Sequence, residues 1–239
     1  MIGGHKVLGV IPARGGSKGL PRKNILPLAG KPLLVWSIET AKASRYIDRL
    51  VLSSDDDAIM EVARRHGCDV PFCRPSELAS DSATTMDALR HAIEQLPGYA
   101  ITVVLQPTNP LRNSDDIDRT LERLEQTGAN SCVTVTQPDK SPYWTFNMNN
   151  GVLTPILGDE YSQKRRQDLP EAWVLNGCVY AVRTQWFLET HQLISEGTVG
   201  QPMPKERSLD IDTGLDLKIA ELMMQINNSN KLLAGETHP

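Results

Sequence analysis

The chain has 239 residues, of which 40% are hydrophobic and 23% are charged, and its formal net charge is −4. This length suits one substantial α/β domain with an insertion, or two small domains, and the composition is that of an ordinary globular protein. The net negative charge gives no general electrostatic reason for binding nucleic acid or membranes. No segment approaches membrane-spanning length and no long apolar signal region opens the chain, so we expect a cytoplasmic protein.

The first predicted element is a buried strand over residues 7–11, where the run Val-Leu-Gly-Val-Ile is continuously apolar. Residues 12–24 follow as a loop with three glycines, two prolines and four cations, which are Arg14, Lys18, Arg22 and Lys23. Glycines let backbone N–H groups face a ligand closely, and the carboxyl end of a strand is where open α/β sheets bind ligands. The loop therefore predicts a triphosphate site, with an exposed basic turn as the alternative.

This loop matches neither of the two commoner glycine motifs. A Walker A loop requires Gly-Lys-Ser/Thr, whereas Gly19 is followed by Leu20, and the spacing of Gly15 and Gly16 cannot supply a G-x-G-x-x-G fingerprint.

The rest of the chain alternates between helix and strand patterns. We predict helices over residues 33–43, 58–66, 84–96, 115–127 (capped by Ser114) and 215–226, and strands over residues 49–53, 101–105, 132–135 and 179–182. This alternation is typical of a Rossmann-like α/β fold, a mostly parallel sheet with helices on both faces. The predicted core spans residues 1–136 and 173–229, and residues 230–239 are predicted to be a frayed tail.

The alternation is interrupted over residues 137–172, where four prolines fall and a β-hairpin is predicted around Gly151. Tyr143, Trp144 and Tyr161 cluster in this segment, and exposed aromatic side chains are typical of subunit contacts. We therefore predict an inserted dimerisation arm. The alternative is a cover that packs on its own domain.

Two carboxylates lie one residue apart in Ser-Leu-Asp-Ile-Asp-Thr, residues 208–213. Side chains alternate along an extended segment, so Asp210 and Asp212 point to the same side and can share one hard cation such as Mg²⁺. Asp216 is expected at the start of the last helix. An isolated Asp-x-Asp is a weak signal, and a purely structural role remains the alternative.

Together these motifs resemble the sugar-activating cytidylyltransferases, in particular the CMP-sialic acid synthetases (acylneuraminate cytidylyltransferases). The family loop Ala-Arg-x-x-Ser-Lys-Gly-Leu-x-x-Lys-Asn is matched over residues 13–24, and its Asp-Ile-Asp-Thr motif over residues 210–213. Residues 106–112 resemble its Gln-Pro-Thr-Ser-Pro-Leu-Arg motif, with Asn109 in place of the serine. The resemblance runs from about residue 7 to residue 224 and implies a nucleotide-diphospho-sugar transferase-like fold.

The resemblance implies a reaction in which CTP and a free acidic nine-carbon sugar give a CMP-sugar and pyrophosphate, with Mg²⁺ as cofactor. It implies catalytic roles for Arg14, Lys18, Lys23 and Asp212, of which Arg14 and Lys18 would hold the β- and γ-phosphates and Lys23 would lie near the α-phosphate. The metal ligands would be Asp210 and Asp212. The implied nucleotide-binding residues are Ala13, Arg14, Gly16, Ser17, Lys18, Asn24, Arg74, Thr85 and Gln106.

The sugar half of the implied site departs from the family pattern. Its implied residues are Gln106, Arg166, Gln167, Asn176 and Tyr180, and the arm is implied to reach the active site of the partner in a homodimer. Val174 stands where characterised sialic acid synthetases carry a second basic residue, and Trp144 stands where some members carry lysine. The sugar is therefore expected to be sialic acid or a relative such as legionaminic or pseudaminic acid.

Two other functions remain open from the sequence. The first is a CMP-Kdo synthetase or another sugar nucleotidyltransferase, although Lys18-Gly19-Leu20 differs from the Arg-Leu-Pro of the Kdo enzymes. The second is a catalytically silent nucleotide-binding or scaffolding protein, against which the intact cations and aspartates argue.

Overall fold

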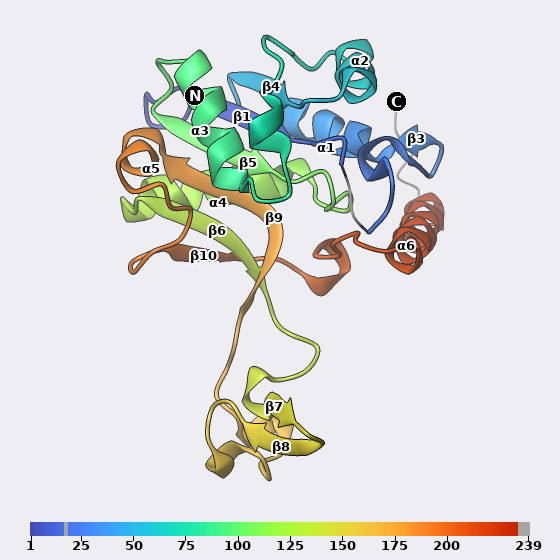
Figure 1. Cartoon of the computed structure of the whole chain (residues 1–239), viewed down its shortest axis with the longest axis vertical. Coiled ribbons are helices and arrows are strands. Elements are labelled where there is room, and N and C mark those ends of the chain that lie inside the picture. The colour runs from blue at the N-terminus through green and yellow to red at the C-terminus, as the bar shows by residue number, and fades with distance from the viewer. Residues whose placement is uncertain (17–18, 234–239) are drawn as a thin grey trace.

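The computed structural model describes residues 1–16 and 19–233, with side chains described up to residue 227. Its centre is a six-stranded sheet in the order β10-β6-β9-β5-β1-β4 (Figure 1). The strands are β1 (Val7–Pro12), β4 (Arg49–Ser53), β5 (Ile101–Leu105), β6 (Ser131–Thr136), β9 (Val174–Arg183) and β10 (Val199–Pro202).

The sheet is mostly parallel, as predicted, and β9 is the exception. β1 pairs in parallel with β4 and β5, and β10 with β6, whereas β9 runs antiparallel between β5 and β6. Its inner part is buried on both faces, which is why β1 and β5 are continuously apolar rather than alternating. The sequence pattern found β9 only from residue 179 onward and missed β10, a short edge strand.

Helices cover both faces of this sheet (Figure 1). Side chains of α1 (Leu33–Lys42), α2 (Asp57–Arg65) and α4 (Ser114–Thr127) share one buried apolar cluster, and those of α3 (Thr85–Gln95) and α5 (Thr184–Thr190) share another. Side chains of α6 (Gly214–Leu233) pack beside a short hairpin of β2 (Pro27–Leu28) and β3 (Lys31–Pro32). The predicted helices agree within about two residues, except that α5 was missed and α6 continues past residue 226 into the predicted tail. Residues 234–239 of that tail lie outside the described residues.

A second hairpin stands away from the core on two long connections (Figure 1). It consists of β7 (Phe146–Asn149) and β8 (Val152–Pro155), and it leaves the core after β6 and returns into β9. Because β9 is antiparallel to β6, both connections meet the sheet at the edge where the parallel strands end. This segment is the predicted hairpin arm.

The three aromatic residues that the sequence singled out in the arm are not exposed, contrary to the sequence interpretation. Tyr143, Trp144 and Tyr161 are half-buried, and the rings of Tyr143 and Tyr161 lie 4.7 Å apart between centroids. The two tyrosine rings thus pack against each other within the arm. The large apolar side chains that the arm exposes are mostly not aromatic, namely Phe146, Met148, Val152, Leu153, Ile156 and Leu157.

A bulge in β9 explains how this strand enters the arm. The register between β6 and β9 shifts between Val133 and Val135, which leaves ladder groups unpaired. The Asn176 side-chain oxygen accepts hydrogen bonds from Thr134 Oγ1 (2.7 Å) and Cys178 N–H (3.1 Å), which substitute for part of the ladder. Asn176 is thus a structural residue of the bulge.

The N-terminal cap of helix α4 differs from the sequence prediction. The sequence predicted Ser114 as its cap, but Asn113 is the cap, and its side chain accepts a hydrogen bond from Asp116 N–H at 3.0 Å. We expect Asn113→Ala to lower the free energy of unfolding by about 1 kcal/mol, because the Asp116 N–H at the start of the helix loses its acceptor. Ser114→Ala is the matched control and should leave stability nearly unchanged. Chemical denaturation measures both, and an equal loss from the two substitutions would contradict the assignment of the cap.

Candidate active site

A cavity of about 410 Å³ opens at the carboxyl ends of β1 and β5, where the sequence places its nucleotide-binding motifs. It brings together seven of the predicted site residues from five separate segments of the chain. They are Arg14, Lys23, Asn24, Arg74, Thr85, Gln106 and Asp212. Ser17 and Lys18, which complete the predicted phosphate loop, lie outside the described residues.

Lys23 connects the basic loop to the acidic segment across this cavity. Its ammonium donates hydrogen bonds to the Ile211 carbonyl oxygen at 2.7 Å and to Asp212 Oδ1 at 3.0 Å. The Lys23 side chain is only 13% exposed, whereas that of Asp212 is 74% exposed. The cation is therefore held in place while the carboxylate remains open to a ligand.

Arg14 lines the same cavity and contacts the segment that precedes α3. Its Nη1 donates to the Ser80 carbonyl oxygen at 2.8 Å and lies 3.6 Å from Asp81 Oδ1. The Asn24 side chain donates to the Arg14 carbonyl oxygen at 3.0 Å, which fixes the start of the loop. Arg14 and Lys23 thus both present positive charge at the cavity, as a polyphosphate requires.

The remaining predicted loop residues have different environments. Ala13 is buried and its N–H donates to the Ser53 carbonyl oxygen at 3.0 Å, so it anchors the loop to β4. Gly16 is exposed, with open space where a Cβ would stand. This space is compatible with the close approach of a ligand.

Arg74 forms part of the cavity wall and is only 5% exposed. Its guanidinium is bound to Ser53, with Nε 3.0 Å from Ser53 Oγ and Nη2 donating to the Ser53 carbonyl oxygen. Burial lowers its pKa to about 10, with Arg14 acting in the same direction and Asp55 opposing. Arg74 therefore remains charged at neutral pH and adds positive potential to the wall.

The acidic segment carries Asp210 and Asp212 in irregular backbone directly before α6. Desolvation raises the pKa of Asp210, with the charge of Asp212 acting in the same direction, whereas a hydrogen bond with Thr108 and the charge of Lys23 lower it. Asp216 joins the start of α6 to the acidic segment, since its carboxylate accepts hydrogen bonds from Thr213 N–H and Oγ1, both at 2.7 Å, and from Asp212 N–H at 3.2 Å. These bonds lower the pKa of Asp216, and the expectation that it begins the helix is confirmed.

Asp210 and Asp212 could hold a metal ion with help from a ligand. Among the described residues no group of three His, Cys, Asp or Glu side chains comes together to bind a metal. Two carboxylates beside a phosphate site nevertheless fit Mg²⁺, which usually keeps waters and substrate oxygens as its other ligands.

A second cavity of about 380 Å³ shares Thr85 and Gln106 with the first and continues toward α5. Tyr180 lines it, together with Met86, His191, Gln192, Leu193 and Ile194. Burial raises the pKa of the Tyr180 phenol, so the hydroxyl stays protonated and can donate a hydrogen bond. The sequence did not identify residues 191–194, which follow α5 and line this cavity, because they carry no motif.

The other residues predicted for the sugar half lie elsewhere. Arg166 and Gln167 are on the arm, and the Arg166 guanidinium donates to the carbonyl oxygens of Asp139 (3.0 Å) and Pro138 (3.1 Å). Neither residue lines either of the two cavities. Asn176 is buried, and its amide group donates to Ser208 Oγ at 2.9 Å, so its side chain is committed to protein partners.

The chain is similar to known cytidylyltransferases. The cytidylyltransferase family model matches residues 8–172. The chain is 33% identical to the pseudaminic acid cytidylyltransferase of Campylobacter jejuni, over 94% of this chain and 99% of that protein. It is 31% identical to the N-acylneuraminate cytidylyltransferase of Escherichia coli, over 95% of this chain and 54% of that protein.

A solved structure shares the fold. A CMP-2-keto-3-deoxy-manno-octonic acid synthetase complexed with CTP superposes with a TM-score of 0.72 at 18% identity, covering 92% of this chain and 99% of that one. No helix in the described part of the chain is both long and apolar enough to cross a membrane.

The close approach of the loop to the acidic segment supplies a test. A Cβ on Gly19 would stand 2.6 Å from the Asp212 carbonyl oxygen, so any side chain there must push two backbone segments apart. We expect Gly19→Ala to cost about 1–3 kcal/mol of unfolding free energy through overpacking. Gly16→Ala is the control, because nothing lies within 4 Å of its added Cβ. Equal stabilities of the two variants in denaturant titrations would show that the approach is not tight.

Proposed function

This chain belongs to the cytidylyltransferase family, and we propose that it uses CTP to activate an acidic nine-carbon sugar, forming a CMP-sugar and pyrophosphate. The observation that carries the proposal is the junction of Lys23 and Asp212 in a cavity that Arg14 and Arg74 make positive. A triphosphate needs such cations, and an adjacent carboxylate suits the metal that accompanies it.

The reaction requires little covalent chemistry from the protein. The anomeric hydroxyl oxygen of the sugar bonds to the α-phosphorus of CTP, the bond from that phosphorus to pyrophosphate breaks, and the hydroxyl proton is released. Catalysis by positioning and charge neutralisation is sufficient for this transfer. In this proposal Arg14 and Lys18 hold the β- and γ-phosphates, and Lys23 lies near the α-phosphate. The nucleoside lies among Asn24, Arg74 and Thr85.

We propose Mg²⁺ as the cofactor, held by Asp210 and Asp212. When bound, it would polarise the α-phosphoryl group and favour loss of the hydroxyl proton. Lys23 keeps Asp212 directed at the cavity through its 3.0 Å contact, and its attachment to the Ile211 carbonyl oxygen keeps the ammonium within the site.

The second cavity is the proposed place of the sugar. Gln106 lines both cavities and offers donor and acceptor groups to sugar hydroxyls, and the Tyr180 hydroxyl adds a further donor. The similarity to a pseudaminic acid and an N-acylneuraminate cytidylyltransferase supports a nonulosonic acid as the substrate class.

We further propose a homodimer formed through the arm. Cross-strand pairing places Met148 opposite Leu153 and Phe146 opposite Pro155, so one face of the hairpin is apolar. Met148 is 74% exposed and Leu153 58% exposed. Helix α6 also exposes an apolar stripe, made of Leu215, Ile219, Leu222 and Ile226. A second copy would cover these surfaces and would bring its Arg166 toward a sugar carboxylate, for which a guanidinium fork is suited.

The activity is tested by pyrophosphate release from CTP with a panel of sialic, legionaminic, pseudaminic and Kdo acids. We expect turnover with at least one of the three nonulosonic acids, and dependence on Mg²⁺. Asp210→Asn and Asp212→Asn should abolish turnover while the fold is retained, because the cation needs both negative charges. Asp115→Asn is the matched control, since Asp115 is 63% exposed on α4 and lines neither cavity. Turnover with Kdo alone, or near-normal kcat in both aspartate variants, would contradict the proposal.

The proposed dimer is tested by placing charged residues on one face or the other of the β7–β8 hairpin. We expect the double variant Met148→Lys/Leu153→Lys to give monomers with little activity, because the charges cannot be buried between subunits. Asn147→Lys/Thr154→Lys places the same charges on the other face, since these residues also pair across the strands, and should leave the dimer intact. Light scattering reports the mass of each variant. A monomeric wild type with full activity would rule out the proposed dimer.

A further inference from the structure

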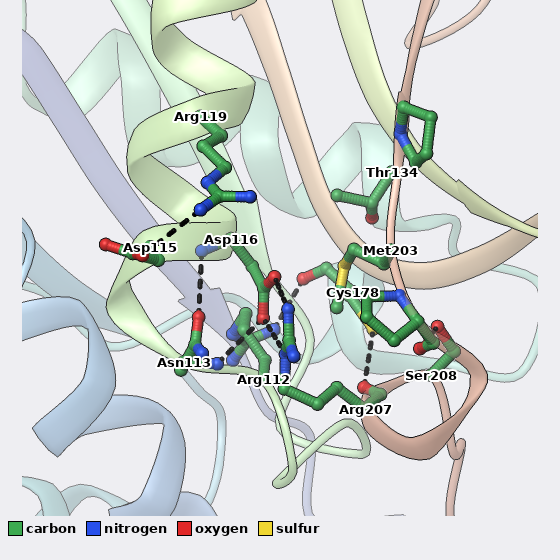
Figure 2. Close-up of polar contacts among 12 residues, drawn as sticks. Arg112, Asn113, Asp115, Asp116, Arg119, Thr134, Cys178, Met203, Arg207 and Ser208 are labelled. Carbon is green, nitrogen blue, oxygen red and sulfur yellow. Dashed lines mark hydrogen bonds and ion pairs between the residues drawn. The ribbon is translucent and has the colours of Figure 1, made fainter.

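A buried ion pair joins α4 to the segment that carries the two site aspartates (Figure 2). Arg207 ends a 3-10 helix, Lys205–Arg207, three residues before Asp210. Its Nε donates to Asp116 Oδ2 at 2.9 Å and its Nη2 to Asp116 Oδ1 at 2.7 Å. Asp116 is 3% exposed, and Arg207 is half-buried. The guanidinium therefore meets the carboxylate at two points and in one orientation.

Helix capping does not account for this pair. Asp116 also accepts a hydrogen bond from Asn113 N–H at 3.0 Å, and an uncharged amide oxygen could do the same. Burying a carboxylate and a guanidinium costs desolvation, so such pairs contribute little net stability compared with apolar residues. What the two-point contact adds is a defined distance and direction.

The same carboxylate also faces Arg112, which holds the turn after β5. Figure 2 shows Arg112, Asp116 and Arg207 gathered in one cluster. Nη1 and Nη2 of Arg112 each lie 3.4 Å from the Gln106 carbonyl oxygen, and Nη2 donates to Ser37 Oγ at 2.7 Å. Asp116 thus stands between a cation that supports Gln106 at the cavity and a cation that begins the acidic segment.

The acidic segment itself lacks regular secondary structure between residues 208 and 213. Its backbone is held from the neighbouring turn, because Asn109 Nδ2 donates to the Leu209 carbonyl oxygen at 3.3 Å and Ile211 N–H donates to the Thr108 carbonyl oxygen at 2.9 Å. Lys23 holds the far end through Ile211. At the near end Asn176 Nδ2 donates to Ser208 Oγ at 2.9 Å, and the Arg207–Asp116 contact adds the charged attachment that ties this end of the segment to α4.

We infer that Asp116 and Arg207 are positioning residues, whose ion pair sets the placement of Asp210 and Asp212 for metal binding and transfer. Neither residue lines the nucleotide cavity, and both act through the backbone of residues 208–212. This inference rests on the proposed function for its link to turnover, but it also predicts a metal affinity that is measured without turnover.

The test uses Asp116→Asn and Arg207→Lys in the full chain. Asp116→Asn retains an oxygen for the Asn113 N–H, and Arg207→Lys retains the positive charge but loses the two-point contact. We expect each to weaken Mn²⁺ binding, measured by calorimetry with CTP and without sugar, and to lower kcat, both by about tenfold to a hundredfold, as for other groups that orient metal ligands. The KM for CTP should change little, and each variant is measured well below its own thermal midpoint, because an ion pair that loses one partner destabilises the fold. Arg119→Gln is the control, because Arg119 lies 3.6 Å from Asp115 in a pair that is 63% exposed on both sides.

The outcomes are distinguishable. Equal Mn²⁺ affinity in wild type and both ion-pair variants, including no measurable affinity in any of them, overturns the inference. A rise in the KM for CTP with unchanged kcat also overturns it, because the pair would then serve nucleotide binding. A wild type that releases no pyrophosphate with any sugar of the panel contradicts the proposed function, and Mn²⁺ affinity then decides the inference alone.

Discussion

The contact of Lys23 with Ile211 and Asp212 is the interaction on which the candidate site depends. It joins residues 188 positions apart in the chain and closes the phosphate loop against the acidic segment. The approach is so close that only glycine fits at position 19 without displacing the Asp212 backbone. A cation that bridges these segments compensates the negative charge of Asp212 and leaves its carboxylate accessible. The cavity is therefore built by the same interaction that would prepare it for a metal-bound triphosphate.

The antiparallel direction of strand β9 determines where the arm is attached to the sheet. Because it runs against β5 and β6, the chain leaves and re-enters the sheet at the edge where the cavity opens. The bulge at Asn176 lets β9 continue outward as one side of the arm, and the Asn176 amide supplies the hydrogen bonds that the bulge removes from the ladder. The arm is thus attached at the edge where the cavity opens, although Arg166 lines neither the nucleotide cavity nor the second cavity of its own chain.

Buried cations organise the walls between these parts. Arg74 and Arg112 are both nearly inaccessible to solvent, and burial lowers the pKa of each to about 10. Each donates to backbone carbonyl oxygens at the ends of central strands, Arg74 at Ser53 and Arg112 at Gln106. These guanidinium groups fix loop conformations that apolar side chains could not specify, because carbonyl oxygens at strand ends need donors.

The sequence by itself determined the fold class and most of the polar residues that meet in the first cavity. Continuous apolar strands, helical periodicity and the loop of residues 12–24 are local patterns, and each reflects a local requirement of backbone geometry or burial. Arg14, Lys23 and Asp212 could be named because they lie in such motifs, and the structure brings them together. Ser17 and Lys18 belong to the same loop, and their placement lies outside the described residues.

Only the tertiary structure decided which side chains meet across the chain. The direction of β9, the internal packing of Tyr143 against Tyr161 and the burial of Asn176 depend on partners distant in sequence, so no local pattern reports them. The same holds for the Asp116–Arg207 pair, since each residue alone has the pattern of an ordinary surface charge. The two hydrogen bonds between them join α4 to the acidic segment, and they form only when these two segments pack together.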